Sequence, residues 1–262
     1  MRHFSPVKIF LAAACALPPA AAAAADWKVS SSVNYETGTY GTKKWTDSVY
    51  IPFTLKRYYA YADLSVTVPY LRQSSRGLIT RVGGSPVRVG RNTASASSDT
   101  PASGLGDILV RGSLAVKKEG PRSFDLALVG NLKLPTANER KGLGTGEMDE
   151  GAGFALAKKV TPRWTLLADG YFTIIGDPPG IDYSNELALD IGFYRSVGAN
   201  LWLTGLYETR SAIVSGNADP RDISGRLEYS SPGGNRYSCG LLFGLSEGSP
   251  DIGLSVGLSR GF

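Results

Sequence analysis

Residues 186–210 read ELALDIGFYRSVGANLWLTGLYETR, and their apolar side chains recur with a period of two. From Leu187 to Phe193 the apolar residues alternate with smaller or polar ones such as Asp190. The alternation returns from Leu201 to Tyr207, with Thr204 on the other face, after a short break that contains Gly, Ala and Asn. A period of two is typical of a β-strand whose two faces meet different surroundings. The stretch therefore predicts two antiparallel strands joined by a short turn.

The same alternation recurs along the chain after Ala25. It marks about twelve segments, each near the roughly 9–11 residues that a tilted strand needs to cross a bilayer. Short and long connections take turns, and the longest spans residues 73–104. Outer-membrane barrels have short turns at the periplasmic rim and longer loops at the external rim. We therefore predict an all-β protein, a transmembrane antiparallel up-and-down β-barrel with both termini on the periplasmic side. The segments are 27–36, 49–56, 63–68, 107–116, 124–134, 151–156, 164–173, 186–194, 201–208, 223–229, 237–245 and 252–259.

A soluble β-sandwich or a lipocalin-like barrel is the alternative reading of this alternation. Such folds turn their apolar faces inward against bulky core partners. Here the second face carries charged residues and many glycines, and aromatic residues such as Trp27, Trp164 and Phe262 lie at strand ends. Aromatic girdles at both interfaces are typical of membrane barrels. These features favour the membrane barrel.

The first 25 residues have the three parts of a secretory signal. Arg2 and Lys8 accompany the apolar stretch IFLAAACALPPAAAAAA at 9–25. A basic start, a short apolar segment and small residues before the cleavage point define such a signal. We predict a cleaved signal peptide at 1–25 and a single transmembrane barrel domain at 26–262. Lipidation at Cys15 is the alternative for this segment.

Composition argues against catalysis and against nucleic-acid binding. The one histidine, His3, lies in the predicted signal, so the mature chain has no Ser–His dyad and no histidine ligand for a metal or haem. Removal of Arg2 and Lys8 with the predicted signal lowers the net charge from +5 to +3, which is mild for a protein that binds nucleic acid. We therefore expect no enzymatic activity, no cofactor, no metal site and no nucleic-acid partner.

Three stretches carry a family resemblance. They are SGLGDILVRGSLAV at 103–116, LKLPTANERKGLGTGEMDEG at 132–151 and IPFTLKRYYAYADLSVTVPYL at 51–71. Together they resemble the family of outer-membrane barrel transporters linked to phenol meta-pathway degradation. The resemblance implies a barrel that admits small, often hydrophobic, compounds. Asn138 departs from the pattern, because a glycine is expected after the Pro-Thr pair.

Charged and amide side chains fall on the face opposite the apolar one. Because charges on the lipid side of a membrane barrel are costly, we expect these side chains to face the lumen. Twelve strands lie between the eight of filled barrels and the sixteen of open porins, which predicts a narrow lumen. We predict a channel that passes small molecules, such as hydrophobic or aromatic compounds, under the control of external loops. The alternative is a plugged barrel that acts as a structural or surface-interaction protein. The predicted lumen residues are Asp63, Asp107, Arg111, Asp125, Asn131, Lys133, Asp169, Glu186, Asp190, Arg226 and Glu228.

The longest predicted loop, 73–104, is basic. It is interpreted either as a solvated external loop, as a site for lipopolysaccharide phosphates, or as a filter folded into the barrel mouth. Guanidinium groups support the second reading because they match phosphate geometry. The loop contains a single acidic residue, Asp99. The candidate gating or phosphate-binding residues are Arg76, Arg81, Arg88 and Arg91.

The sequence GLGTG at 142–146 superficially resembles a phosphate-binding loop. Such a loop needs a helix after it, whereas EMDEGAG follows here and predicts a strand. We expect a tight external turn with its glycines at positive φ. The acids Glu147, Asp149 and Glu150 are expected to be solvated, with Ca²⁺ binding as the alternative.

The sequence ends on GLSVGLSRGF at 253–262, whose apolar residues share one face of the expected closing strand. A terminal aromatic residue on such a strand resembles the signal that the outer-membrane assembly machinery reads, so Phe262 is the predicted assembly signal. Cys239 falls on the apolar face beside Leu241, where it is expected to act as a small hydrophobic residue. The expected partners are outer-membrane lipids and lipopolysaccharide, the assembly machinery and small solutes.

Overall fold

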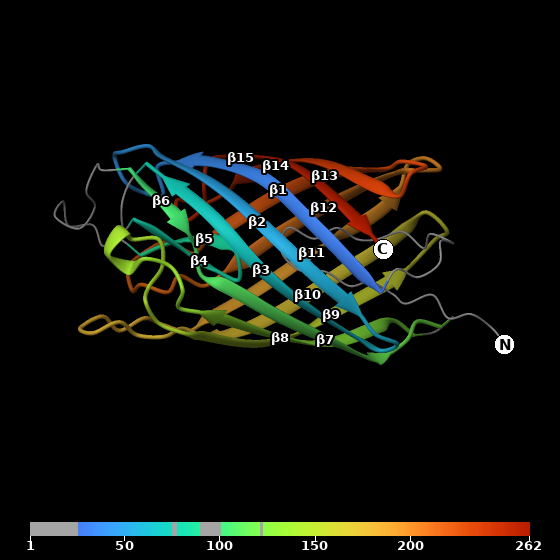
Figure 1. Cartoon of the computed structure of the whole chain (residues 1–262), viewed down its shortest axis with the longest axis horizontal. Coiled ribbons are helices and arrows are strands. Elements are labelled where there is room, and N and C mark those ends of the chain that lie inside the picture. The colour runs from blue at the N-terminus through green and yellow to red at the C-terminus, as the bar shows by residue number, and fades with distance from the viewer. Residues whose placement is uncertain (1–25, 75–77, 90–100, 121–122) are drawn as a thin grey trace.

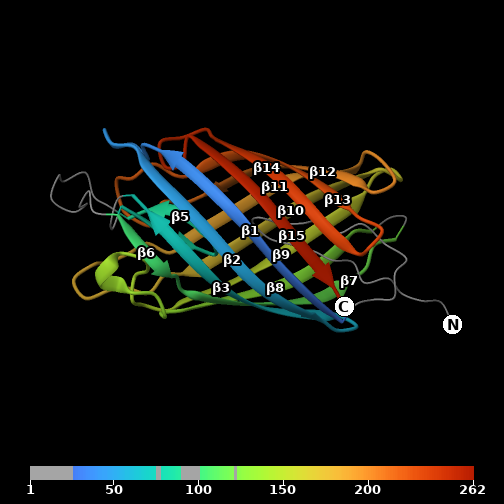
Figure 2. The same ribbon diagram turned by 45° about the horizontal axis from the view of Figure 1, so that its top comes forward.

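Twelve antiparallel wall strands close into a barrel in the computed structural model (Figure 1). The structure describes residues 26–74, 78–89, 101–120 and 123–262. The all-β antiparallel barrel predicted from the alternation is confirmed. The strands tilt strongly across the long axis of the barrel (Figure 2). The elements are β1 (Trp27–Gly38), β2 (Thr46–Tyr58), β3 (Ala62–Gln73), β4 (Ile79–Val82), β5 (Ser85–Arg88), β6 (Ala102–Leu105), β7 (Ile108–Lys117), β8 (Asp125–Leu134), η1 (Glu139–Lys141), β9 (Asp149–Lys159), β10 (Trp164–Ile174), β11 (Glu186–Ser196), β12 (Leu201–Arg210), β13 (Arg221–Ser230), β14 (Asn235–Gly244) and β15 (Ile252–Gly261).

The wall of the barrel is continuous because each wall strand pairs with its neighbours on both sides. β1 pairs with β2 and β15, and β2 pairs with β3, which closes the sheet. One of the twelve wall strands is made of two segments, β6 and β7. β3 pairs with β7 along one part of its length and with β6 along the other. Between these two segments the amide of Gly106 donates to the carbonyl oxygen of Pro69 at 2.9 Å. Closure removes the unpaired sheet edge that a bilayer would not tolerate.

The two faces of the wall are chemically inverted relative to a soluble β-protein. On the outside, Leu187 and Val256 expose 63% and 67% of their surface. On the inside, Asp190 is only 4% exposed. Trp202 and Leu206, which interrupt the polar face of their segment, also lie on the inward face of β12 together with the buried Thr204. The interior is therefore polar, with a few apolar side chains among the charges.

Both β1 and β15 reach the same rim of the barrel. There the amide of Trp27 donates to the carbonyl oxygen of Phe262 at 3.1 Å, and the amide of Phe262 returns a bond to Trp27 at 3.0 Å. Short turns such as 197–200 lie at this end, which we call the short-turn rim, and long connections such as 135–148 lie at the other, the loop rim. This alternation of short and long connections agrees with the sequence prediction.

Deleting Phe262 should lower the yield of folded barrel several-fold while leaving the assembled barrel unchanged in its pore properties. The deletion removes both hydrogen bonds with Trp27 at the seam between β1 and β15, and it removes the proposed assembly signal. The measurement is the fraction of heat-modifiable, membrane-inserted protein. The matched control, Phe243→Leu on the outward face of β14, should leave the yield near wild type. Equal yields for the deletion and the control would contradict the assembly role.

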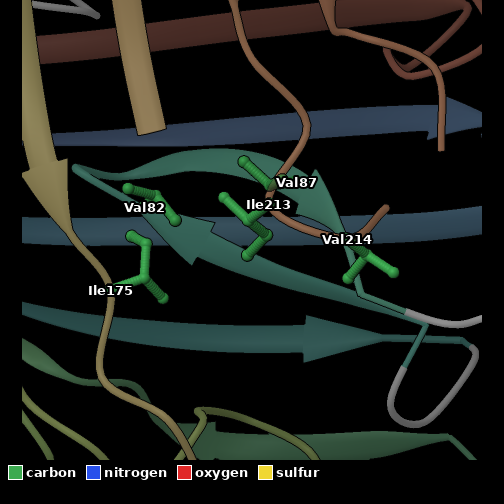
Figure 3. Packing of buried hydrophobic residues seen from close by; sticks show 5 residues of the cluster. All are labelled: Val82, Val87, Ile175, Ile213 and Val214. Atoms are coloured by element: carbon green, nitrogen blue, oxygen red, sulfur yellow. The ribbon is translucent and has the colours of Figure 1, made fainter. Parts of the chain in front are cut away.

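The segment 73–104 is not a simple external loop, because it contains the β4–β5 hairpin, which packs inside the loop rim. Figure 3 shows Val82 and Val87 of the hairpin against Ile175, Ile213 and Val214, which follow β10 and β12. These five side chains are at most 5% exposed. This apolar cluster therefore lies in the mouth of the barrel, between the hairpin and two long loops.

A two-glycine turn allows the hairpin to be this tight. Gly83 and Gly84 have φ of 59° and 97°, and such values favour glycine in the short turns that join hairpin strands. A second apolar cluster, made of Tyr40, Leu78 and Ile79, packs the start of the hairpin against the loop between β1 and β2. The sequence prediction of a loop over 73–104 missed this hairpin because its strands are only four residues long.

Within the connection 135–148, the GLGTG stretch at 142–146 forms a turn and not a phosphate-binding loop. Asn138, which departs from the family pattern, caps η1 because its Oδ1 accepts the amide of Lys141 at 3.1 Å. Gly142 and Gly146 have positive φ of 67° and 80°, as the turn prediction requires, and strand β9 follows.

Among the described residues, no helix is long and apolar enough to cross a membrane.

Candidate functional site

The interior of the barrel contains a cavity of ≈ 330 Å³, whose lining comes from β1, β2, β3, β7 to β10 and β12 to β15. Strands β1, β13, β14 and β15 contribute mostly small side chains to it, so this sector of the wall leaves space. We call this sector the small-residue wall; its members are Ser30, Ser32, Ser224, Ser238, Gly240, Ser255 and Gly257. The other strands contribute larger and charged side chains to the lining, such as Lys56, Arg111 and Lys133.

The predicted lumen residues lie inside the barrel or at its mouth. One group lines the cavity: Arg111, Asn131, Lys133, Arg226 and Glu228. A second group is buried outside the cavity: Asp63, Asp107, Asp125, Asp169, Glu186 and Asp190. Asp107 differs from the rest because it precedes β7 instead of lying within a strand. Its Oδ1 accepts the amide of Ala137 at 2.9 Å, which ties the 135–148 connection to the wall.

Two buried lysines neutralise carboxylates within the lumen. Lys56 Nζ lies 2.7 Å from Asp63, whose other oxygen accepts the Ser113 hydroxyl at 2.6 Å. Lys133 Nζ lies 2.8 Å from Asp149 and 3.8 Å from Asp107. Pairing of this kind is required, because an unpaired charge in a buried site costs several kcal/mol.

Arg81 holds the tip of the hairpin against the wall. Its guanidinium forms an ion pair with Glu36 on β1, and Nη2 also donates to the Ser48 hydroxyl at 3.0 Å. The same group lies 4.2 Å from the ring centre of Tyr50, and its Nη1 donates to the carbonyl of Gly84 at 2.8 Å. We call this set of contacts the hairpin latch. It joins the hairpin to β1 and β2 inside the barrel.

Arg88 anchors the other end of the hairpin. Its Nη1 donates to the carbonyl oxygen of Tyr40 at 2.9 Å, and its own carbonyl accepts the Asn217 amide at 3.2 Å. Tyr40 has a φ of 47°, the one positive value among the described non-glycine residues, and burial raises the pKa of its hydroxyl well above the ordinary range. Arg81 and Arg88 are thus both buried side chains that hold the hairpin to β1, β2 and the loop between them. Arg76 and Arg91 lie outside the described residues.

Four carboxylates form a row across neighbouring strands, and we call them the acidic row. Asp169 on β10 is paired in register with Asp190 on β11, Asp190 with Glu208 on β12, and Glu208 with Asp222 on β13. All four are buried and face inward. The nearest guanidinium, that of Arg210, lies 3.5 Å from Glu208. Residues opposite one another on adjacent strands are about 5 Å apart, so this row concentrates negative charge on one side of the lumen.

Sequence reasoning missed Glu208, Arg210 and Asp222 as site residues. Glu208 lies at the end of the predicted segment 201–208, but alternation within one strand does not fix which residues meet across strands. Register is set by turn geometry and by the packing of both faces, and a shift of one residue exchanges the faces. No signal in a single strand could therefore have identified the acidic row.

The acids after the GLGTG turn do not converge. Asp149 points inward to Lys133, whereas Glu150, the next residue of β9, is exposed on the other face. Among the residues that the structure describes, no group of three or more His, Cys, Asp or Glu side chains is arranged to hold a metal ion. Cys239 is exposed on the outward face of β14, as is its neighbour Leu241.

Comparison with known families decides the relationship. Residues 20–226 match the family described as "Putative MetA-pathway of phenol degradation". The chain belongs to this family. The resemblance inferred from the three quoted stretches is therefore confirmed. No curated protein matches the chain.

Solved structures similar to this family member are outer-membrane barrels. An outer-membrane channel from Pseudomonas putida F1 has a TM-score of 0.69 at 14% identity, covering 92% of this chain and 97% of that one. The NanC porin has a TM-score of 0.60 at 9% identity, covering 89% of this chain and 100% of that one. The CymD monoaromatic hydrocarbon channel has a TM-score of 0.51 at 8% identity, covering 91% and 89%. At these identities the likeness concerns the fold alone.

Proposed function

We propose that this chain is an outer-membrane channel that passes small molecules through a narrow polar lumen, with the β4–β5 hairpin as its constriction. The observation that carries the proposal is the inverted barrel, apolar outside and charged inside, with a cavity of ≈ 330 Å³ within it. A polar interior is the arrangement of barrels that conduct water-soluble solutes. The hairpin tip contributes Gly83, Gly84, Ser85 and Pro86 to the cavity wall, so it narrows the path.

The proposed orientation puts the short-turn rim in the periplasm and the loop rim outside the cell. It rests on the general wiring of outer-membrane barrels and on the predicted signal peptide at 1–25, which lies outside the described residues. In this orientation the hairpin closes the external mouth. Lipopolysaccharide would then contact the outward face near the loop rim, and the assembly machinery would act on the strand that ends at Phe262.

Aromatic compounds are proposed as one class of solute. CymD is described as a monoaromatic hydrocarbon channel, and the family description refers to phenol degradation. In this chain the ring of Tyr50 lines the cavity, where it offers an aromatic surface to such a solute, whereas Tyr171, Tyr194 and Trp202 are buried outside the cavity. Stacking against such rings is favourable for planar molecules.

A plugged structural barrel is the second candidate. It is favoured by the apolar cluster of Val82, Val87, Ile175, Ile213 and Val214, which fixes the hairpin in the mouth. In that case the barrel would bind a partner or lipopolysaccharide at its loop rim. Trimming the loop would abolish this binding without changing solute uptake.

Purified protein reconstituted in a planar bilayer should produce discrete conductance steps. Liposomes that contain it should also take up a small aromatic compound faster than a disaccharide, because the lumen is narrow. Protein unfolded by heat before reconstitution is the control. A heat-modifiable, well-folded barrel that stays silent would reject the channel and leave the plugged barrel.

A further inference from the structure

The charged side chains that line the cavity are mostly basic. Among the described residues, the lining contains eight basic and five acidic side chains. Three of these acids form ion pairs with cations that also line the cavity. The pairs are Glu36 with Arg81, Asp149 with Lys133 and Glu208 with Arg210. The lining residues outside these pairs are the basic Lys28, Lys56, Arg111, Arg226 and Arg236 and the acidic Asp222 and Glu228. The lining therefore has a surplus of positive charge.

This surplus lies toward the short-turn rim. Lys28 and Lys56 are register partners near that rim, where β1 begins and β2 ends. Lys56 is bound to Asp63 at 2.7 Å, and the charges of Lys28 and Arg111 both act on it as well. Arg236 is the second residue of β14, which begins at the same rim. The acids of the three ion pairs lie toward the loop rim instead, so the two halves of the cavity differ in charge.

Carboxylates near the cavity do not cancel the surplus. Toward the short-turn rim the acidic side chain that lines the cavity, among the residues the structure describes, is Glu228. Arg226 is its neighbour on the inward face of β13, and Arg236 lies on the adjacent strand β14. Of the acidic row, Asp169 and Asp190 lie outside the cavity. A solute in the short-turn half of the cavity therefore meets more cations than carboxylates.

Arg236 has a hydrogen-bond donor available at this end of the cavity. Its Nη1 atom is buried and has no hydrogen-bond partner among the described residues. Its register partners on the two neighbouring strands are Ser230 and Ser259, and the next inward residue of β14 is Ser238. Ser230 Oγ is also buried without a partner, while Ser238 and Ser259 line the cavity. Buried polar atoms without a partner indicate that a ligand or water completes a site. We call Arg236 and these three serines the arginine–serine site.

We propose that the channel prefers anionic solutes over cationic ones and that small organic carboxylates bind at the arginine–serine site. The proposal rests on the channel function proposed above and names the charge class of its solute. A narrow lumen lined by an excess of one charge concentrates ions of the opposite charge. A guanidinium group offers N–H donors in a fork that matches a carboxylate, and serine hydroxyls donate to the same kind of oxygen. The small-residue wall, which includes Ser238, leaves space for the body of the solute.

The test compares two solutes of similar size and opposite charge. Wild-type protein in a planar bilayer is given a KCl gradient, and then sodium benzoate against benzylammonium chloride. We expect a Cl⁻/K⁺ permeability ratio of roughly three or more, and a preference for benzoate over benzylammonium. Arg236→Gln should lower both preferences by roughly half, whereas Arg236→Lys keeps the charge and should retain the preference for Cl⁻. The matched control Arg260→Gln removes an exposed arginine from the outward face of β15 at the same rim and should change neither.

The outcomes separate this inference from the channel proposal. A conducting barrel that prefers K⁺, or that shows no preference, overturns the anion proposal and leaves the channel in place. A folded but silent barrel overturns the channel, and the anion proposal falls with it. If Arg236→Gln does not fold, the wild-type comparison of benzoate with benzylammonium decides the matter alone. An equal loss of preference in Arg260→Gln and Arg236→Gln would reject the arginine–serine site as its source.

Discussion

Excising the β4–β5 hairpin should increase single-channel conductance several-fold. Replacing residues 78–89 by a short Gly–Ser linker removes the hairpin tip from the cavity wall, and it removes Val82 and Val87 from the apolar cluster in the mouth. The excision leaves Glu36 without its partner Arg81, so it is combined with Glu36→Gln. The measurement is the size of single conductance steps in a planar bilayer, together with uptake of a disaccharide that the wild type admits slowly.

Smaller changes at the hairpin latch test the same idea. Arg81→Ala should raise conductance less than excision does, because Arg88 and the apolar cluster still hold the hairpin. The matched control is Arg72→Ala, which removes an exposed arginine on the outward side of β3. Unchanged step sizes after excision would mean that the constriction lies elsewhere in the lumen.

Replacing Lys133 by methionine should destabilise the barrel by about 3–5 kcal/mol. The substitution leaves Asp149 and Asp107 as buried carboxylates without their cation, and it removes the bond from Nζ to the Thr145 hydroxyl at 2.8 Å. Because Lys133 is only 3% exposed, solvent does not screen this loss. The measurement is the urea midpoint of unfolding in detergent, followed by heat-modifiable migration on a gel.

The rescue variant separates lost charge from lost packing. Lys133→Met combined with Asp107→Asn and Asp149→Asn should recover most of the stability, since neutral amides no longer need the cation. A single Lys133→Met variant with a wild-type midpoint would show that the pair contributes nothing to stability. If the triple variant does not recover stability, the lost packing of the lysine side chain is a larger effect than the lost charge.

The architecture was predictable because each strand carries its own signal. In residues 186–210 the alternation of Leu187, Leu189 and Ile191 with polar positions identifies a strand and its two faces without knowledge of its neighbours. The family assignment was also accessible, because the motifs around Gly104 and Gly142 are local in sequence. The two faces of each strand and the family of the chain are therefore both encoded in short stretches of sequence.

The candidate site was predictable only in part, because it depends on relations between strands. Asp169 and Asp190 could be assigned to the polar face, but their alignment with Glu208 and Asp222 requires the register. The hairpin escaped notice for a different reason. Residues Ile79–Val82 and Ser85–Arg88 are too short to show a period, and they are fixed by packing against Ile213 in a distant loop. Long-range contacts of this kind leave no local pattern.

Because the strands are tilted, the four carboxylates of the acidic row lie at different depths along the barrel axis. Residues in register lie along a line perpendicular to the strands, and strands in membrane barrels tilt by roughly 40°. With neighbouring strands about 4.8 Å apart, the four carboxylates from Asp169 to Asp222 descend about 9 Å along the axis. They form a sequence of steps at different depths instead of a ring at one depth. Their negative charge is therefore distributed over several depths, so that replacing one of them changes the electrostatic potential at one level of the barrel more than at the others.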